Sequence, residues 1–134
     1  MSSEPGGPAS GPGGRALVVD DDPGVSRLLS DILALEGLAV DTVASAEACF
    51  ERLAGGGLPT LILLDVMLPG IDGFDTLARL RGSTRTASIP VIMISTLPEK
   101  SYHRRAEDLG AVAYLRKPFA PRELIDTVRR AVGK

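Results

Sequence analysis

The feature that most constrains the fold is an alternation, repeated five times, of a short apolar run and a longer amphipathic stretch. The apolar runs predict strands at residues 16–20, 38–43, 60–65, 89–95 and 113–115. The amphipathic stretches predict helices at residues 22–37, 45–57, 72–82, 99–110 and 120–132. Strands separated by helices imply a parallel sheet with right-handed crossovers, and five strands are too few for a closed eight-stranded barrel. We therefore expect one α/β domain, a doubly wound (βα)5 fold whose flavodoxin-like parallel sheet has the strand order 2-1-3-4-5.

Polar residues mark the beginnings of several predicted helices. Asp22 is a predicted N-cap with Pro23 in the first turn, and Ser45 and Asp72 are predicted to cap the second and third helices. The pattern Thr96-x-x-Glu99 fits a capping box before the fourth helix. The first helix has an inward stripe predicted from apolar residues at helical spacing, namely Val25, Leu28, Leu29, Ile32 and Leu35. Those of the last helix are Leu124, Ile125, Val128 and Val132.

Composition restricts the classes of protein to which the chain can belong. Its 15 basic and 17 acidic residues give a net charge of −2, which argues against direct nucleic-acid binding by this domain. No apolar run is long enough to span a bilayer, and the first residues do not resemble a signal peptide. The single cysteine, Cys49, cannot form an internal disulfide, so we expect a reducing, cytoplasmic setting. Residues 1–14 are mostly Gly, Pro, Ser and Ala and predict a flexible tail before a folded domain at residues 15–134.

One predicted strand runs from buried apolar residues directly into a carboxylate, Asp65. The carboxyl ends of parallel strands meet at one edge of a sheet, and ligands bind there near the point where the strand order reverses. The first strand ends in Asp20 and Asp21, the fourth ends in Ser95, and the fifth continues to Lys117. We therefore expect carboxylates, a hydroxyl and an ammonium group to meet at one edge of the sheet.

This combination of groups predicts a particular chemistry. Neighbouring carboxylates repel one another unless a cation joins them. Mg²⁺ prefers oxygen ligands and keeps several waters, so it suits a partly hydrated acidic site. Carboxylate, metal, ammonium and hydroxyl groups together suit a phosphoryl group, whose transfer depends mainly on positioning and charge stabilisation. Asp65 is then the candidate nucleophile, because aspartate can form an acyl phosphate.

Four segments in order, ALVVDDDPGVSRLL, LILLDVMLPGIDGFD, PVIMIST and GAVAYLRKPF, resemble the successive motifs of response-regulator receiver domains from two-component signalling. The resemblance covers residues 15–134. It implies a phosphorylation-activated switch, in which a sensor histidine kinase or a histidine phosphotransfer protein donates a phosphoryl group to Asp65 with Mg²⁺ bound. It also implies a surface change that is read by a downstream effector, by an output domain of the same protein or by a second copy in a phosphorylation-dependent homodimer. Catalysis would be limited to the domain's own phosphorylation and dephosphorylation, so an enzyme is not expected.

Carried over by position, the resemblance implies a role for each candidate residue. The implied magnesium ligands are three carboxylates and one backbone carbonyl, namely Asp20, Asp21, Asp65 and Met67. Lys117 and the hydroxyl of Ser95 are implied to contact the phosphoryl group, and Tyr114 is implied to change its rotamer when Ser95 moves. The peptide bond before Pro118 is implied to be cis.

Structural explanations stay open beside these roles. Ser95 also fits as a small strand residue, Tyr114 as a half-buried strand aromatic, and His103 as a solvated surface residue. Met67 and Leu97, two residues beyond Asp65 and Ser95, are apolar and cannot orient a hydrolytic water, so we predict a long-lived phosphate.

Three alternative functions share this fold or this chemistry. A Mg²⁺-dependent phosphohydrolase with an aspartyl nucleophile usually has a second carboxylate two residues further on, where this chain has Met67. A flavodoxin-like module that binds FMN needs a phosphate loop rich in Ser, Thr and Gly, where this chain has DDDPG. A pseudo-receiver would keep the fold without phosphorylation, although all the acidic and lysine positions are present here.

Overall fold

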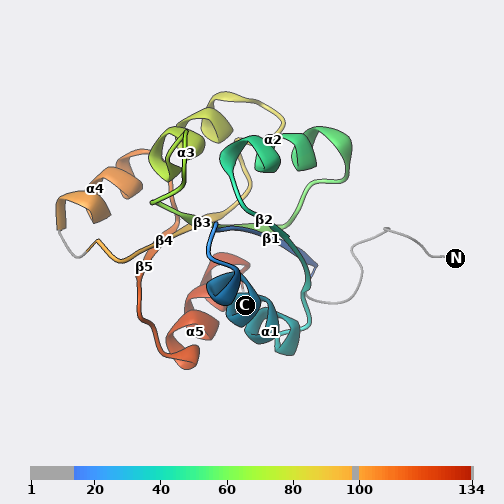
Figure 1. Cartoon of the computed structure of the whole chain (residues 1–134), viewed down its shortest axis with the longest axis vertical. Helices are drawn as coiled ribbons and strands as arrows, with labels where there is room; N and C mark the ends of the chain where they lie inside the picture. Colours follow the sequence, from blue (N-terminus) through green and yellow to red (C-terminus); the bar gives the residue numbers. More distant parts are fainter. Residues whose placement is uncertain (1–13, 98–99, 134) are drawn as a thin grey trace, which may run out of the picture.

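The structure is a computed structural model, and it describes residues 14–97 and 100–133. At its centre lies a five-stranded parallel sheet in the order β2-β1-β3-β4-β5 (Figure 1), as predicted. The strands are β1 (Arg15–Val19), β2 (Ala39–Val43), β3 (Leu61–Asp65), β4 (Val91–Ser95) and β5 (Ala113–Arg116). The helices are α1 (Pro23–Leu35), α2 (Ala46–Gly55), α3 (Gly73–Gly82), α4 (Lys100–Asp108) and α5 (Pro121–Ala131). The predicted doubly wound α/β class is confirmed.

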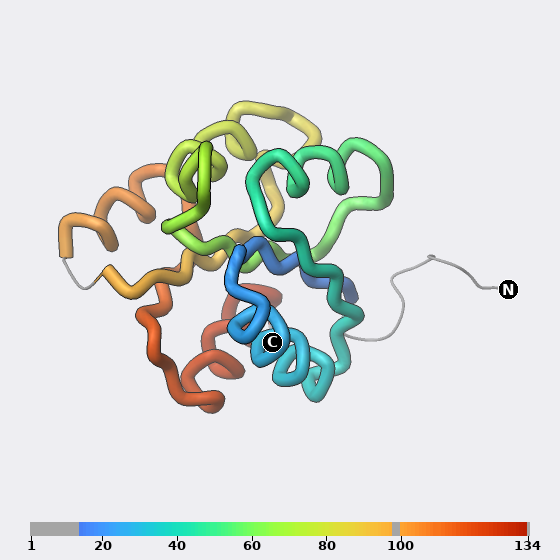
Figure 2. The backbone as a smooth tube through the Cα atoms, viewed as in Figure 1, coloured from blue at the N-terminus to red at the C-terminus, as the bar shows by residue number. Residues whose placement is uncertain are grey.

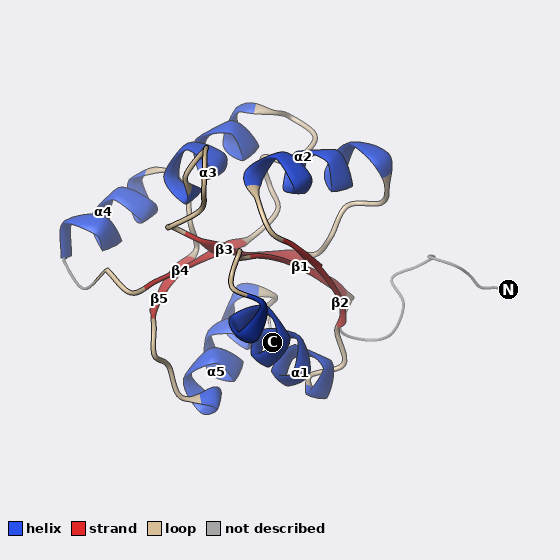
Figure 3. Ribbon diagram, viewed as in Figure 1, coloured by secondary structure: helices blue, strands red, loops and turns tan. Residues whose placement is uncertain are grey.

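Helices cover both faces of the sheet. α1 and α5 lie on one face, and α2, α3 and α4 lie on the other (Figure 3). The chain winds outward from β1 to β2 and then crosses back through β3 to β5 (Figure 2). The strand order therefore reverses between β1 and β3, and the C-terminal ends of these two strands are where an open sheet of this kind binds its ligand.

The core consists of one hydrophobic cluster on each face of the sheet. All five residues of β3 and of β4 are buried, as expected for strands that are covered on both sides. None of the five residues of the edge strand β2 is fully buried, in agreement with its alternating sequence. Among the helices of residues 14–97 and 100–133, none combines the length and the hydrophobicity needed to cross a membrane.

Three predicted helix caps are confirmed. The carboxylate of Asp22 accepts hydrogen bonds from the second and third residues of α1, and Ser45 and Asp72 each accept one bond in the first turn of α2 and α3. These side chains satisfy backbone N–H groups that have no partner within the helix. The predicted capping box depends on Glu99 and the predicted tail on residues 1–13, which lie outside the described residues, so both stay predictions.

The predicted inward stripe of α1 is partly wrong. Leu29 and Ile32 are buried as expected, but Leu28 is 48% exposed and Leu35 is 81% exposed. Leu33, which was not in the predicted stripe, is fully buried. α1 has apolar residues on more than one side, so their spacing is compatible with two overlapping stripes, and the packing of α1 against the sheet and α5 selects one of them.

Candidate functional site

Asp65 lies at the end of β3, and the start of α3 packs directly behind it. The N–H of Gly73 donates to the carbonyl of Val66 at 2.9 Å. A Cβ atom at position 73 would collide with the carbonyl oxygen of Asp65 and would lie 2.7 Å from the Cα of Val66. Only glycine permits this close approach, so the Asp-Gly pair at residues 72–73 caps α3 and fixes its first turn against the end of β3.

Asp20 and Asp21 follow the end of β1, beside Asp65. Asp20 is 3% exposed, and its Oδ1 accepts a hydrogen bond of 2.9 Å from the backbone N–H of Asp22, the N-cap of α1. Asp21 is exposed, and no donor within residues 14–97 and 100–133 bonds to its carboxylate. The first carboxylate is therefore held rigidly, whereas the oxygens of the second are available to a ligand.

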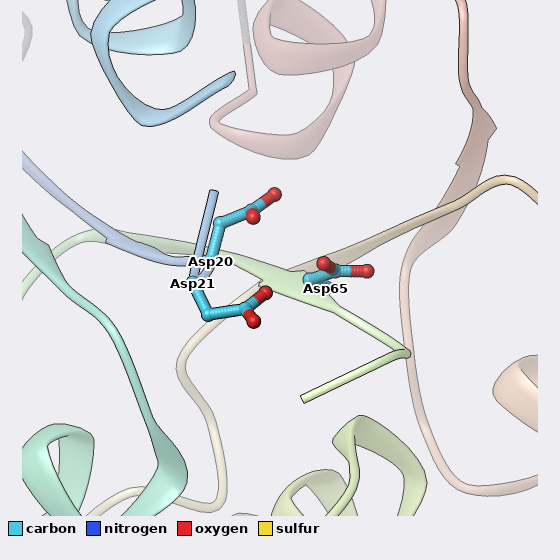
Figure 4. A group of neighbouring side chains, drawn as sticks. All are labelled: Asp20, Asp21 and Asp65. Atoms are coloured by element: carbon cyan, nitrogen blue, oxygen red, sulfur yellow. The ribbon is translucent and has the colours of Figure 1, made fainter. Parts of the chain in front are cut away.

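The three carboxylates meet at the reversal point of the sheet. Each of Asp20, Asp21 and Asp65 has a carboxylate oxygen within 4.8 Å of the others, and the side chains extend into the same region (Figure 4). Asp65 is 5% exposed, and its Oδ1 accepts a bond of 3.1 Å from the N–H of Met67. Burial, together with the charge of Asp20, raises the pKa of Asp65 above its usual value, although the Met67 bond and Lys117 oppose this shift.

Lys117 joins two of these carboxylates. Its Nζ lies 2.9 Å from Oδ2 of Asp20 and 3.3 Å from Oδ2 of Asp65. Burial of the ammonium group lowers the pKa of Lys117, but the hydrogen bonds and charges of the two aspartates outweigh burial, so the net shift is upward. The lysine is therefore charged at neutral pH, and its backbone N–H is also fixed by the carbonyl of Ser95 at 2.8 Å.

Ser95 and Tyr114 are connected to each other through the backbone of Leu97. The hydroxyl oxygen of Ser95, which is fully buried, accepts a bond of 2.9 Å from the N–H of Leu97. The hydroxyl of Tyr114 donates to the carbonyl of Leu97 at 3.1 Å. The ring of His103 lies against the ring of Tyr114, with 4.0 Å between the centroids. One residue of the β4–α4 connection thus links the buried serine to an aromatic side chain of β5.

The donor set of the acidic cluster fits a divalent cation with a preference for oxygen. Three carboxylates and one ammonium group leave two uncompensated negative charges. Because Lys117 contacts Asp20 and Asp65, the exposed carboxylate of Asp21 provides the open side of the cluster. A hard cation that keeps several waters, such as Mg²⁺, needs few protein ligands and suits this arrangement.

Residues 16–129 match the profile of the response regulator receiver domain. The chain belongs to this family. A receiver domain is a phosphorylation-activated signalling switch, and the family uses Mg²⁺ at an acidic pocket. Family membership confirms the predicted fold class and function, and the acidic cluster at the end of β1 and β3 is consistent with both.

Two relatives of this receiver domain are named as transcriptional regulators. The chain is 41% identical over 119 residues to the DNA-binding dual master transcriptional regulator RpaA of Synechocystis sp., covering 86% of this chain and 47% of RpaA. It is 38% identical over 115 residues to the phosphate regulon transcriptional regulatory protein PhoB of Rhizobium meliloti, covering 86% of this chain and 50% of PhoB. The chain therefore spans about half the length of the curated relatives that it matches.

Solved receiver structures share the fold closely. The BeF3-activated N-terminal receiver domain of RstA from Klebsiella pneumoniae superposes with a TM-score of 0.81 at 28% identity, covering 90% of this chain and 99% of that one. The chemotaxis protein CheY4 of Vibrio cholerae superposes with a TM-score of 0.80 at 26% identity, covering 87% and 97%.

The structure brings together four of the predicted site residues, namely Asp20, Asp21, Asp65 and Lys117. Ser95 and Tyr114 bond to Leu97 instead of to the acidic cluster. The Lys117–Pro118 bond is cis, as the resemblance implied. Sequence reasoning missed the two backbone bonds of Leu97 and the contact between His103 and Tyr114. The sequence carries no signal for either, because the bonds of Leu97 depend on the path of the connection after β4 and the His103 contact depends on how α4 lies across β5.

Proposed function

We propose that this receiver domain accepts a phosphoryl group on the carboxylate of Asp65. The observation that carries the proposal is the meeting of three carboxylates within 4.8 Å, with Lys117 in contact with two of them. Clustered carboxylates repel one another and burial disfavours their charged forms, so the arrangement costs stability in the absence of a ligand. A site that holds a cation beside a nucleophilic carboxylate accounts for that cost.

The proposed metal ligands are the carboxylates of Asp20, Asp21 and Asp65 and the backbone carbonyl of Met67. Bound Mg²⁺ supplies positive charge that balances the carboxylates and the oxygens of an incoming phosphoryl group. The bond of 2.9 Å from Asp22 to Asp20 and the bond of 3.1 Å from Met67 to Asp65 hold two of these carboxylates in place before any ligand arrives. Such preorganisation lowers the cost of binding.

The proposed donor is the phosphohistidine of a sensor histidine kinase or of a histidine phosphotransfer protein. A carboxylate oxygen of Asp65 attacks phosphorus opposite the P–N bond, so that a P–O bond forms while the P–N bond breaks. The imidazole nitrogen keeps the electron pair of the broken bond and takes up a proton. The ammonium group of Lys117, 3.3 Å from Oδ2 of Asp65, offers charge to the transferred oxygens. A depression of about 510 Å³ adjoins Asp20 and Asp21, between α1 and the end of β2.

The proposed switch begins at Ser95. Phosphorylation adds about 1.5 to 2 negative charges and new acceptor oxygens to Asp65. The hydroxyl of Ser95 then turns toward the phosphoryl group and releases the N–H of Leu97, whose carbonyl holds Tyr114. Tyr114 changes its rotamer, and the surface of α4, β5 and α5 changes with it. A downstream effector, an output domain or a second copy of the chain reads this surface.

We also propose that the phosphoryl group is long-lived. Met67 is 58% exposed and Leu97 is half-buried, and neither side chain can hold a water in position for hydrolysis. The half-life of the phosphorylated protein with Mg²⁺ tests this proposal, and rapid self-dephosphorylation contradicts it.

The names and lengths of the relatives support an output domain as a reader of the switch. RpaA and PhoB are named as transcriptional regulators about twice as long as the matched segment, which supports an output domain as one reader of the switch. We propose that residues 15–134 form the receiver unit and that this unit is located in the cytoplasm. We also propose that it catalyses only its own phosphorylation and dephosphorylation.

The direct test is incubation of the protein with acetyl phosphate and Mg²⁺, followed by measurement of the intact mass. The wild-type protein should gain one phosphoryl group, and Asp65→Asn should gain none. Glu51→Gln, which changes an exposed carboxylate on α2, is the matched control and should be labelled like the wild type. Labelling of Asp65→Asn to the wild-type extent would show that another residue is the acceptor.

A further inference from the structure

The sulfur atoms of the described part of the chain differ sharply in their exposure. Met93, in the centre of β4, and Cys49, on α2, are both fully buried. Burial raises the pKa of the Cys49 thiol to about 11, with Arg52 lowering it only in part, so little reactive thiolate is present at neutral pH. Met67, in contrast, is 58% exposed. Oxidants that approach from solvent therefore meet the thioether of Met67 before the other two sulfurs.

Met67 is also an immediate neighbour of the candidate nucleophile. Its backbone N–H donates to Oδ1 of Asp65 at 3.1 Å, so the main chain of Met67 is held against the acidic cluster. Met67 is largely exposed to solvent, although methionine side chains usually fill gaps in cores or binding surfaces. A chemical change on this exposed side chain therefore takes place two residues from the candidate nucleophile, on a backbone that is bonded to its carboxylate.

We propose that Met67 is a modification site, at which oxidation by hydrogen peroxide to the sulfoxide shortens the lifetime of the phosphoryl group on Asp65. This inference rests on the proposed function. A lone pair of the Met67 sulfur attacks one peroxide oxygen, the S–O bond forms as the O–O bond breaks, and the second oxygen leaves as water after proton transfer. The thioether loses two electrons and the peroxide gains them. Methionine sulfoxide reductases reverse the reaction.

The physical consequence follows from the polarity of the product. Oxidation replaces an apolar thioether by a strongly polar S–O group, which accepts hydrogen bonds. The apolar side chain cannot hold a water next to the phosphoryl group, whereas the sulfoxide oxygen can. One added hydrogen bond of ordinary strength in the transition state of hydrolysis accelerates it about five-fold. Peroxide would thereby switch the receiver domain off sooner after each phosphorylation.

The first measurement is the position and rate of oxidation, and it does not depend on the proposed function. Wild-type protein is treated with dilute hydrogen peroxide, the peroxide is removed with catalase, and the oxidised methionines are mapped by mass spectrometry. Met67 should be oxidised at least about ten-fold faster than Met93, because Met93 reacts only through transient opening of the sheet. Equal rates at the two residues would overturn the inference.

The second measurement is the half-life of the phosphorylated protein with Mg²⁺, each protein being compared with its own untreated sample. Peroxide should shorten the half-life of the wild type about five-fold and leave that of Met67→Leu unchanged, and a sulfoxide reductase should restore the wild-type value. Met67→Gln, which carries a permanent acceptor, should have a shorter half-life than Met67→Leu without peroxide. An unchanged half-life in fully oxidised wild-type protein overturns this inference but leaves the proposed function intact. If untreated protein takes up no phosphoryl group, the proposed function fails and the inference fails with it.

Discussion

Replacing Lys117 by methionine removes the cation that joins two of the three site carboxylates. Its Nζ lies 2.9 Å from Asp20 and 3.3 Å from Asp65, and the three side chains are only 15%, 2% and 6% exposed. With an effective dielectric constant of about 20, each contact contributes an attraction of roughly 5 kcal/mol. Desolvation offsets much of this attraction, yet removing one partner of a buried pair typically costs about 3–5 kcal/mol, because the other charges stay buried.

The cost of Lys117→Met is limited by proton uptake at Asp65. Burial and the charge of Asp20 already hold the pKa of Asp65 above its usual value, and loss of the opposing charge raises it further. We therefore expect the free energy of unfolding to fall by about 2–4 kcal/mol at neutral pH. A carboxyl group whose folded-state pKa is raised destabilises the fold only above its unfolded pKa, about 4, and the loss grows as the pH rises through the folded-state pKa. The variant and the wild type should thus converge toward acidic pH.

Urea denaturation followed by far-UV circular dichroism measures this difference. The matched control is Lys100→Met, which removes an exposed lysine on α4 and should leave the stability close to that of the wild type. Mg²⁺ should recover part of the loss in Lys117→Met, because the metal balances the same carboxylates. Wild-type stability of Lys117→Met, or a loss that is equal at neutral pH and near pH 4, would refute this electrostatic account of the cluster.

Three further predictions follow from individual contacts. Asp21→Asn removes an exposed carboxylate that is a proposed metal ligand, without breaking a bond to the rest of the described chain. The Mg²⁺ affinity measured by calorimetry should therefore fall roughly ten-fold while the apoprotein keeps its stability, and an unchanged affinity would place Asp21 outside the metal site. Because burial raises the pKa of Cys49 to about 11, a thiol reagent at mildly alkaline pH should label the native protein far more slowly than the urea-unfolded chain, and equal rates would contradict this. Gly73→Ala forces a Cβ against the backbone of Asp65, so it should lower the free energy of unfolding by about 1–3 kcal/mol and reduce phosphoryl uptake. The control for both measurements is Gly82→Ala, whose Cβ meets nothing within 4 Å. Wild-type behaviour of Gly73→Ala would show that the loop yields without moving Asp65.

The parts of the fold that the sequence predicts are those governed by local chemistry. Asp22, Ser45 and Asp72 could be recognised as caps because a short polar side chain before an amphipathic stretch has one obvious partner, the free N–H groups of the first turn. Asp65 could be placed at the functional edge because the topology of a doubly wound sheet gathers the strand ends there. The meeting of the carboxylates with Lys117 follows from the same rule, although the roles of these residues stay proposals.

The features that sequence reasoning missed depend on tertiary packing. The helical spacing of apolar residues in α1 predicts that Leu28 and Leu35 lie in the core together with Leu29, but both are exposed. Only the way in which α1 rests on the sheet distinguishes the two sides of the helix. The contact between His103 and Tyr114 depends on how α4 lies across β5, which no local pattern encodes. His103 is exposed as predicted, but exposure alone does not indicate that its ring lies against the ring of the proposed switch residue Tyr114.

Leu97 contributes only main-chain groups to its two bonds: its N–H donates to the hydroxyl oxygen of Ser95, and its carbonyl accepts from the hydroxyl of Tyr114. Mutations that alter only the side chain at this position therefore leave the connection intact, whereas proline alone among the common amino acids would remove the donor. In the proposed switch, the backbone of Leu97 connects Ser95 to Tyr114 of β5, and this connection depends on the route that the backbone takes. If the proposed switch holds, substitutions of the Leu97 side chain can change the lifetime of the phosphoryl group while the connection between Ser95 and Tyr114 is kept.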